Sequence, residues 1–166
     1  MTAPFLIEAL GPAHDRATFS SGVEALDRYF RELVTQDVRR RATACYVALD
    51  QAAAKVAGYY TLAAGGVPLA EMPAELARRL PRYPSVPVAR LGRLAVDEAY
   101  RGRQLGASLL WDAVLRVARS ELAVFALVVD AKDEQAASFY RHHGFTAFGS
   151  LPRQMVLALT NLRPKP

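Results

Sequence analysis

Arg101-Gly102-Arg103-Gln104-Leu105-Gly106-Ala107 decides the fold of this 166-residue chain. The stretch follows an apolar, strand-like run, Leu91 to Val96, and opens a segment with helical apolar periodicity. A turn rich in glycine and arginine lets the backbone approach an anion closely, and the free N–H groups and positive dipole end of the following helix favour negative charge. We therefore expect a strand, a phosphate- or pyrophosphate-binding turn and a helix in succession.

Two other nucleotide-binding patterns do not occur in the sequence. There is no G-x-x-x-x-G-K-[ST], which would supply a lysine and a hydroxyl for a nucleoside triphosphate and its magnesium, and no G-x-G-x-x-G of a dinucleotide-binding fold. Kinase-like and dehydrogenase-like functions are excluded on this basis.

A length of 166 residues predicts one domain over residues 1–166. The composition, 52% hydrophobic and 22% charged, is that of a folded rather than a disordered protein. No apolar run reaches membrane-spanning length, and Met1 to Leu10 lacks the features of a secretory signal, so the expected location is the cytoplasm.

Cys45 is the only cysteine, which excludes an internal disulfide. His142 and His143 are adjacent and form no H-x-x-x-H pair with His14, so no metal site is predicted.

The order of the expected elements indicates a mixed sheet. A capping-box pattern at Ser21–Glu24 predicts a helix with apolar positions at Val23, Leu26, Phe30, Leu33 or Val34, and Val38. Strand, helix and strand alternate in the second half, which implies parallel pairing there. Strands are expected at Phe5–Ala9, Cys45–Leu49, Val56–Leu62 (ended by Gly65-Gly66), Val88–Val96, Phe125–Val129 and Gln154–Leu159, and further helices at Glu71–Leu80, Gln104–Ser120 and Glu134–His143.

The formal charge of +5 comes from 18 Arg and 3 Lys against 16 acidic residues. Many of the arginines are clustered in the sequence. Clustered basic residues attract polyanions such as nucleic acid, but they can also form a solvated face that includes ligands for coenzyme phosphates. Charge alone leaves both interpretations open. The clustered arginines are Arg39, Arg40, Arg41, Arg78, Arg79, Arg82, Arg90, Arg93, Arg101 and Arg103.

Two segments carry a resemblance to a known family. The Arg101 stretch resembles the R/Q-x-x-G-x-G/A pyrophosphate loop of the GNAT N-acetyltransferases, with Gln104 in place of the first glycine. Asp133 to Phe145 is similar to that family's N-x-x-A-x-x-F-Y-x-x-x-G-F segment, with Asp133 in place of the asparagine. The resemblance implies an α/β fold of the GNAT type: a mixed, mostly antiparallel sheet with parallel central strands splayed at the acetyl-CoA site, and helices on both faces.

The same resemblance assigns roles in an acetyl-CoA-dependent acyltransferase. Tyr140 stands where the family places its general acid, although an aromatic residue at helical spacing is otherwise a packing residue. No residue is nominated as a general base. If the loop demands positive φ at Gln104, coenzyme affinity is in doubt, because glycine tolerates that geometry best. The coenzyme-binding residues would be Leu94, Ala95, Val96, Arg101, Gly102, Arg103, Gln104, Leu105, Gly106, Ala107 and Asp133.

Nearly the whole chain resembles the GNAT toxins of bacterial toxin–antitoxin modules, of the TacT type. The segments that carry this likeness are Phe19–Phe30, Gly58–Leu62, Leu91–Asp97 and the Tyr140 segment. The likeness implies acetylation of the α-amino group of aminoacyl-tRNA, which blocks translation, with a ribbon-helix-helix antitoxin as partner and a homodimer. Arg40, Arg78 and Arg93 would face the tRNA.

A site without a base fits an α-amine of pKa about 7.7 to 8.0 better than a lysine amine of pKa about 10.4. Two alternatives stay open. One is an acetyltransferase that acts on a small amine or a protein amino group, and the other is a catalytically silent module that binds acetyl-CoA or an antitoxin.

Overall fold

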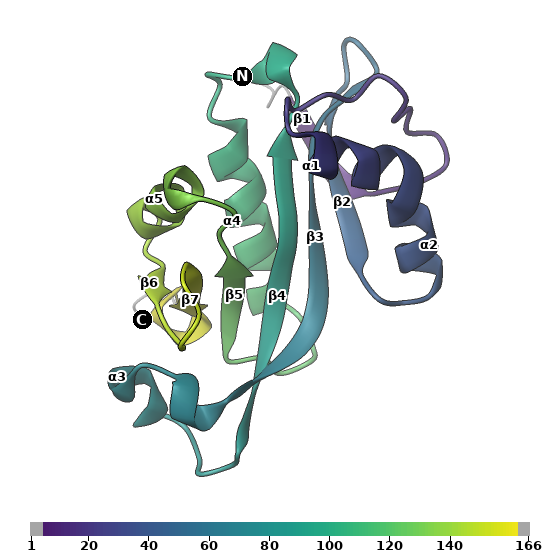
Figure 1. Cartoon of the computed structure of the whole chain (residues 1–166). Helices are drawn as coiled ribbons and strands as arrows, with labels where there is room; N and C mark the ends of the chain where they lie inside the picture. Colours follow the sequence, from purple (N-terminus) through teal and green to yellow (C-terminus); the bar gives the residue numbers. More distant parts are fainter. Residues whose placement is uncertain (1–4, 163–166) are drawn as a thin grey trace. The chain divides into compact units, whose positions relative to one another are not determined.

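The computed structural model describes the backbone of residues 5–162 and the side chains of residues 5–160. Within these residues the chain divides into two compact units, a first unit of residues 5–63 and 92–113 and a second unit of residues 64–91 and 114–162. A single domain over residues 1–166 stays a prediction, and residues 1–4 and 163–166 lie outside the described part. The elements, labelled in Figure 1, are β1 (Phe5–Ala9), α1 (Glu24–Arg28), α2 (Val34–Arg39), β2 (Ala44–Asp50), β3 (Lys55–Pro68), α3 (Ala74–Ala77), β4 (Ser85–Val96), α4 (Leu105–Ala118), β5 (Ala126–Asp130), α5 (Glu134–His142), β6 (Thr146–Ala147) and β7 (Gln154–Ala158).

The strands of the described chain form one 7-stranded sheet in the order β1-β2-β3-β4-β5-β7-β6. The pairs β1–β2, β2–β3, β5–β7 and β6–β7 are antiparallel. The pair β4–β5 is parallel, with Val88–Leu91 beside Ala126–Val129. The predicted mixed, mostly antiparallel sheet with a parallel central pair is confirmed. β4 continues beyond this pairing to Val96, and a 3-10 helix, Glu98–Tyr100, connects it to the predicted anion-binding turn.

Helices cover both faces of β3 in the first unit. Because side chains alternate along a strand, Tyr59 points to one face while Gly58 and Tyr60 point to the other. The Tyr59 ring stacks on Phe30, with 4.2 Å between ring centroids. On the other face, the Tyr60 hydroxyl donates to Asp112 of α4. A Cβ at position 58 would lie 2.9 Å from the Ala95 carbonyl oxygen of β4 and 2.8 Å from a Leu109 methyl of α4, so glycine is needed at this position.

The segment from Glu24 to Arg39 is helical, but it is not the single amphipathic helix that the sequence predicted. A π-helical turn, Tyr29–Leu33, separates α1 from α2. The wider turn rotates the positions that follow it, so Val34 is buried whereas Leu33 and Val38 are 41% and 36% exposed. The predicted burial of Val38 is therefore wrong.

The π-helical turn frees one carbonyl, which a side chain then satisfies. The Val34 N–H donates to the Tyr29 carbonyl rather than to that of Phe30. The Phe30 carbonyl instead accepts a hydrogen bond of 2.7 Å from Arg16 Nη1. Insertion of a side-chain donor at this point explains why the helix keeps the turn.

The start of α1 also differs from the predicted capping box, which is wrong. The residue at the N-cap is Val23, and no side-chain hydrogen bond caps the helix. Ser21 interacts with Asp27 instead of Glu24: its N–H and its hydroxyl both donate to Asp27 Oδ1, at 2.8 and 2.6 Å. Asp27 is only 3% exposed, so these bonds fix the loop before α1 onto the helix.

Three predictions fail in the second unit for local reasons. β3 runs through Gly65-Gly66 to Pro68, so the glycine pair lies inside the strand rather than at its end. The helix expected at Glu71–Leu80 shrinks to Ala74–Ala77, because Pro73 has extended geometry and interrupts it. β6 was not predicted, since its two residues are too few for a pattern of alternation. The prediction for α5 is confirmed, and Gly144, with φ +94°, follows its end.

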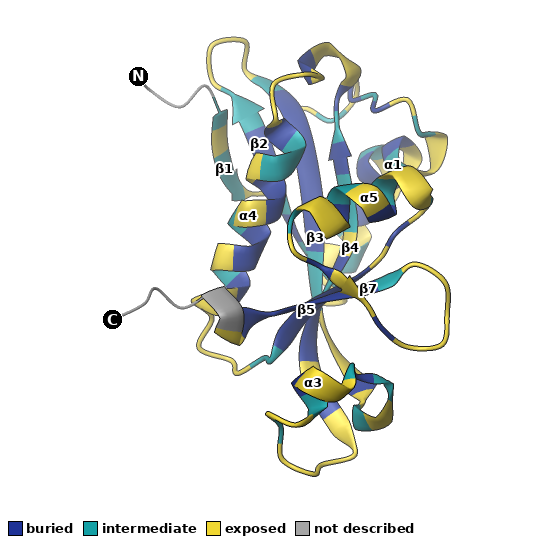
Figure 2. Cartoon of the chain, turned by 90° about the vertical axis from the view of Figure 1, so that its left-hand side faces the viewer, coloured by how far each residue is buried: buried dark blue, intermediate teal, exposed yellow. Residues whose placement is uncertain are grey.

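The core of the second unit lies between α3 and the sheet. Its buried residues are Val67, Met72, Leu76, Val86, Val88, Ala126, Val128, Phe148, Val156 and Ala158. Figure 2 shows the central strands largely buried, and α4 buried along one side and exposed along the other, as its apolar spacing predicted. Among the described helices none is both long enough and apolar enough to cross a membrane.

Candidate active site

The turn that follows β4 is anchored by Asp97, a residue that the sequence did not single out. Asp97 is 3% exposed, and its side chain accepts hydrogen bonds from the backbone N–H groups of Ser20 at 3.0 Å and Ala99 at 2.9 Å. Its own N–H donates to the Ala57 carbonyl at 2.8 Å. Asp97 thus joins the loop before α1, strand β3 and the beginning of the turn.

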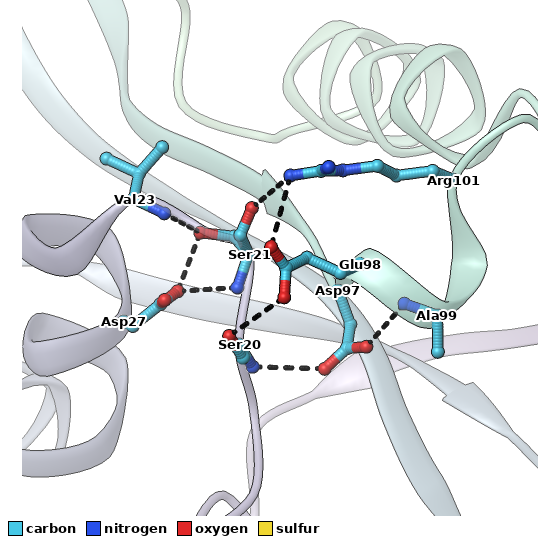
Figure 3. A network of polar contacts seen from close by, with 8 residues as sticks. All are labelled: Ser20, Ser21, Val23, Asp27, Asp97, Glu98, Ala99 and Arg101. Atoms are coloured by element: carbon cyan, nitrogen blue, oxygen red, sulfur yellow. Dashed lines mark hydrogen bonds and ion pairs between the residues drawn. The ribbon is translucent and has the colours of Figure 1, made fainter.

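Arg101 belongs to the same network, which Figure 3 shows. Arg101 Nη2 donates to the Ser21 carbonyl at 2.7 Å and lies 3.7 Å from Glu98 Oε1. Glu98 in turn accepts from the Ser20 hydroxyl at 3.3 Å. The guanidinium that the sequence assigned to phosphate therefore also holds the turn against the loop at Ser20 and Ser21.

Arg103 is supported on the other side of the turn by an aromatic ring. Its guanidinium carbon lies 5.3 Å from the centroid of Tyr100, a distance typical of a cation–π contact. The Tyr100 hydroxyl donates to Asp50 Oδ2 at 2.6 Å. This hydrogen bond lowers the pKa of the Asp50 carboxyl and raises the pKa of Tyr100 to about 12. Arg103 itself is exposed, so its charge is available to a ligand.

The backbone between Gly102 and α4 has the geometry of an anion-binding turn. Gly102 and Gln104 both have positive φ, +79° and +58°. The condition raised for Gln104 is therefore met, since a residue other than glycine occupies the left-handed region in this turn. Helix α4 then begins, and the Ser108 N–H donates to the Gln104 carbonyl at 3.1 Å. In the first turn of a helix the N–H groups have no acceptor within the helix. The donors of residues 105–107 therefore carry the partial positive charge that favours a phosphate.

We expect Gln104→Gly to raise the free energy of unfolding by about 1 kcal/mol, because a residue with a Cβ is strained at positive φ. Denaturant unfolding measures the change. The control is Gly102→Ala: a Cβ there meets no atom within 4 Å, so its effect is purely conformational and should have the opposite sign. Calorimetric titration of acetyl-CoA should show no loss of affinity in Gln104→Gly. A destabilised Gln104→Gly protein would show that the glutamine side chain, and not backbone strain, dominates at this position.

The end of β4 contains the strand assigned to the acetyl group, and it also positions Arg93. Ala95 is buried against the cluster around Phe30, whereas Leu94 and Val96 are half-buried. The Arg93 guanidinium carbon lies only 3.4 Å from the centroid of the Tyr29 ring, in the π-helical turn. The Tyr29 hydroxyl donates to Asp37 Oδ2 at 2.7 Å, and burial raises the pKa of Tyr29. The Tyr29 ring, fixed by Asp37, thus holds the Arg93 guanidinium in place through a cation–π contact.

Tyr140, the predicted general acid, lies on α5 in the second unit. Its ring is 8% exposed, stacks on Phe139 at 5.2 Å and meets the edge of Phe145 at 5.4 Å. Burial raises the pKa of Tyr140 to about 12, so the hydroxyl is protonated at neutral pH. The hydroxyl has no hydrogen-bond partner among residues 5–160. It is not fully buried either, so it keeps some contact with solvent. It can therefore act as a proton donor.

Asp133 caps the helix that carries Tyr140. Its carboxylate accepts from the Ala136 N–H at 2.8 Å and pairs with Lys132 at 3.2 Å. The backbone hydrogen bond and the lysine hold the pKa of this carboxyl below its usual range. Aspartate and asparagine are equivalent in this role, since both accept a hydrogen bond at an N-cap. The departure from the family's asparagine thus preserves the local structure.

The remaining predicted residues lie at the surface. Arg40 is exposed at the end of α2, in the first unit with Arg93, and Arg78 is exposed at the end of α3, in the second unit. No group of three or more His, Cys, Asp or Glu side chains in the described part of the chain could hold a metal ion. Sequence reasoning missed Asp97 and Tyr29. An acidic residue directly after a strand and before a turn was the only available signal for Asp97.

Comparisons with known proteins agree with this geometry. Residues 8–145 match the sequence model of the acetyltransferase (GNAT) family. The chain is 34% identical over 156 residues to the tRNA-acetylating toxin of Mycobacterium tuberculosis. The matched region covers 93% of this chain and 92% of that protein. Among solved structures it is similar to AtaT complexed with acetyl-methionyl-tRNAfMet, with a TM-score of 0.88, 27% identity and coverage of 95% and 96%. It is also similar to a mutant AtaT toxin bound to the C-terminus of the antitoxin AtaR, with a TM-score of 0.80, 26% identity and coverage of 96% of each chain.

Proposed function

This chain belongs to the acetyltransferase (GNAT) family, and on that premise we propose that it transfers the acetyl group of acetyl-CoA to the α-amino group of aminoacyl-tRNA. The observation that carries the proposal is the 34% identity, across 93% of the chain, to a tRNA-acetylating toxin. Acetylation of that amino group would block translation, as expected of the toxin of a toxin–antitoxin module.

The residues of the anion-binding turn fit acetyl-CoA. When bound, acetyl-CoA supplies the activated acetyl group. The first-turn N–H groups of α4 and the positive charges of Arg101 and Arg103 would hold the pyrophosphate, and the open space beside Gly102 leaves the backbone accessible. The backbone of Leu94–Val96 would align the acetyl-bearing arm, as the resemblance implies. The resemblance also assigns Asp133 to coenzyme binding, and in the structure Asp133 caps α5.

Tyr140 would hold the proton that a leaving group needs. Its pKa of about 12 keeps that proton on Oη through the physiological range, and its hydroxyl has no competing acceptor within residues 5–160. An α-amine is already partly neutral near pH 7.7 to 8.0, so it can react without a strong base in the protein.

The pH dependence of kcat/KM follows from these two groups. We expect kcat/KM with aminoacyl-tRNA to rise with pH as the α-amine loses its proton, to level off above about pH 8, and to stay level. The level region persists because Tyr140, with a pKa of about 12, is still protonated there. Initial rates between pH 6 and 10 with labelled acetyl-CoA measure the profile. A rise that continues toward about pH 10.4 would favour a lysine-like amine, and a fall within this range would remove Tyr140 as the acid.

The surface arginines support an RNA substrate. Arg40, Arg78 and Arg93 would contact tRNA phosphates, so binding of tRNA should weaken steeply with salt.

A toxin of a toxin–antitoxin module also binds an antitoxin. The structure of a similar AtaT toxin has been solved in complex with the C-terminus of the antitoxin AtaR. We further propose that the antitoxin is a ribbon-helix-helix protein, that the chain forms a homodimer and that it works in the cytoplasm.

Incubation with charged tRNAs and labelled acetyl-CoA tests the proposal. The expected result is label on the aminoacyl group of at least one isoacceptor, with no label transferred when the tRNA is uncharged. Label on small amines or on protein amino groups, independent of tRNA and salt, would replace the proposed acceptor. Tight binding of acetyl-CoA without any transfer would instead identify a catalytically silent module.

A further inference from the structure

The second unit contains a groove. Of the residues that line it, only Arg78 has been given a role in the proposed function. It has a volume of about 790 Å³ and is formed by the segment that connects the end of β3 to the start of β4. Its walls are mostly apolar, from Leu69, Met72, Ala77 and Leu80, and its rim carries Arg78, Arg82 and Tyr83. Figure 2 shows α3 and the loop beside it largely exposed. A volume of this size is typical of sites that bind small molecules.

Backbone hydrogen bonds make the groove a preformed site. The Leu69 N–H donates to the Pro84 carbonyl at 2.9 Å and closes the base of the segment. The Gly149 N–H donates to the Glu71 carbonyl at 3.2 Å, which ties the segment to the loop before β7. Pro73, at the start of α3, restricts the chain further. A ligand therefore meets walls that need little ordering, and this favours affinity.

The rim of the groove presents cationic groups without protein partners. Arg78 and Arg82 are exposed and form no hydrogen bond or ion pair with residues 5–160. The adjacent Arg79 differs, because it pairs with Glu75 at 3.4 Å. Free guanidinium groups above an apolar groove attract an anionic ligand, and arginine is the residue best suited to phosphate.

The third group of the rim is an aromatic ring. Tyr83 is 69% exposed, and within the described residues it has no ring contact or hydrogen bond. An exposed aromatic face beside arginines is the arrangement on which unpaired nucleotide bases stack while their phosphates are neutralised. An acidic peptide would use the arginines but not the aromatic face, and the bases of a duplex cannot enter a groove.

We propose that this groove binds unpaired nucleotides of the RNA substrate, with a base against Tyr83 and its flanking phosphates on Arg78 and Arg82. The proposal rests on the proposed function, because it locates where a tRNA substrate would be held. It assigns Tyr83 and Arg82 to binding and gives them no part in acetyl transfer.

Fluorescence anisotropy with a labelled single-stranded hexaribonucleotide tests the proposal directly. We expect Tyr83→Ala to weaken binding about 5- to 100-fold, as loss of one stacked base does. Arg78→Ala and Arg82→Ala should each flatten the plot of log affinity against log salt by about 0.7. Arg79→Ala is the matched control, next to Arg78 in the turn after α3, and should change affinity little. All four side chains are exposed, so folding should be preserved.

Three results would overturn the proposal. The first is that Tyr83→Ala and the double variant Arg78→Ala/Arg82→Ala bind the single-stranded RNA with wild-type affinity. The second is that Tyr83→Ala weakens the binding of an RNA duplex as much as that of the single strand. The third is a loss of self-association, measured by sedimentation, without a loss of RNA affinity, which would make the groove an interface between copies. A raised KM for charged tRNA at unchanged kcat would support it. If the wild-type protein acetylates no charged tRNA, the proposed function fails, while the oligonucleotide titration still decides the groove.

Discussion

Tyr140→Phe is expected to lower kcat by about 10²- to 10⁴-fold and to leave the Kd of acetyl-CoA unchanged. The substitution removes only Oη, since phenylalanine keeps the stacking on Phe139 and the edge contact with Phe145. The hydroxyl has no hydrogen-bond partner among the described residues, so the folded state loses little stability. The effect should therefore fall on proton transfer alone. Single-turnover kinetics and calorimetric titration of acetyl-CoA measure the two quantities separately.

Tyr59→Phe is the matched control, because Tyr59 is another buried tyrosine whose hydroxyl does bond to the protein. Its Oη donates to the Leu26 carbonyl at 2.7 Å. Removal of that hydroxyl should cost about 1 kcal/mol of stability with little change in kcat, the reverse of the Tyr140 result. If kcat of Tyr140→Phe stays within a few-fold of the wild-type value, Tyr140 is a packing residue and another group supplies the proton.

Much of the fold could be predicted because its determinants are local. Short, mostly apolar, strand-like runs marked β1, β2, the first part of β3, β4, β5 and β7. The glycine-containing turn and the periodic helix after it placed α4 correctly. The short range of these signals is also why they failed at Gly65-Gly66, where pairing across the sheet overrides the turn preference of glycine.

The candidate site was predictable only in part, since its supports come from distant positions in the sequence. Asp97 acts on Ser20, and Arg93 lies over Tyr29, pairs that no local pattern connects. The π-helical turn that presents Tyr29 depends on Arg16, a residue from the preceding loop. Positive φ at Gln104 could be raised only as a condition, from the glycine that the GNAT loop has there, because glutamine itself does not indicate that geometry as glycine does.

Asp97→Ala is expected to lower the free energy of unfolding by about 2 to 5 kcal/mol, because it strips the acceptor from the backbone N–H groups of Ser20 and Ala99. Loss of the Ser20 contact would also release the loop that Arg101 grips, so the Kd of acetyl-CoA should rise even where the protein folds. Asp97→Asn keeps one acceptor oxygen and should be intermediate in both measurements.

Glu98→Gln is the control for Asp97, since Glu98 is a neighbouring carboxylate that is 51% exposed. We expect it to change stability by less than about 1 kcal/mol, as surface ion pairs usually do. Urea unfolding and calorimetry with acetyl-CoA compare the three variants. If Asp97→Asn loses stability but binds acetyl-CoA with wild-type affinity, Asp97 serves the fold alone. The backbone donors of α4 would then hold the coenzyme without help from the loop at Ser20, because their position depends only on the helix.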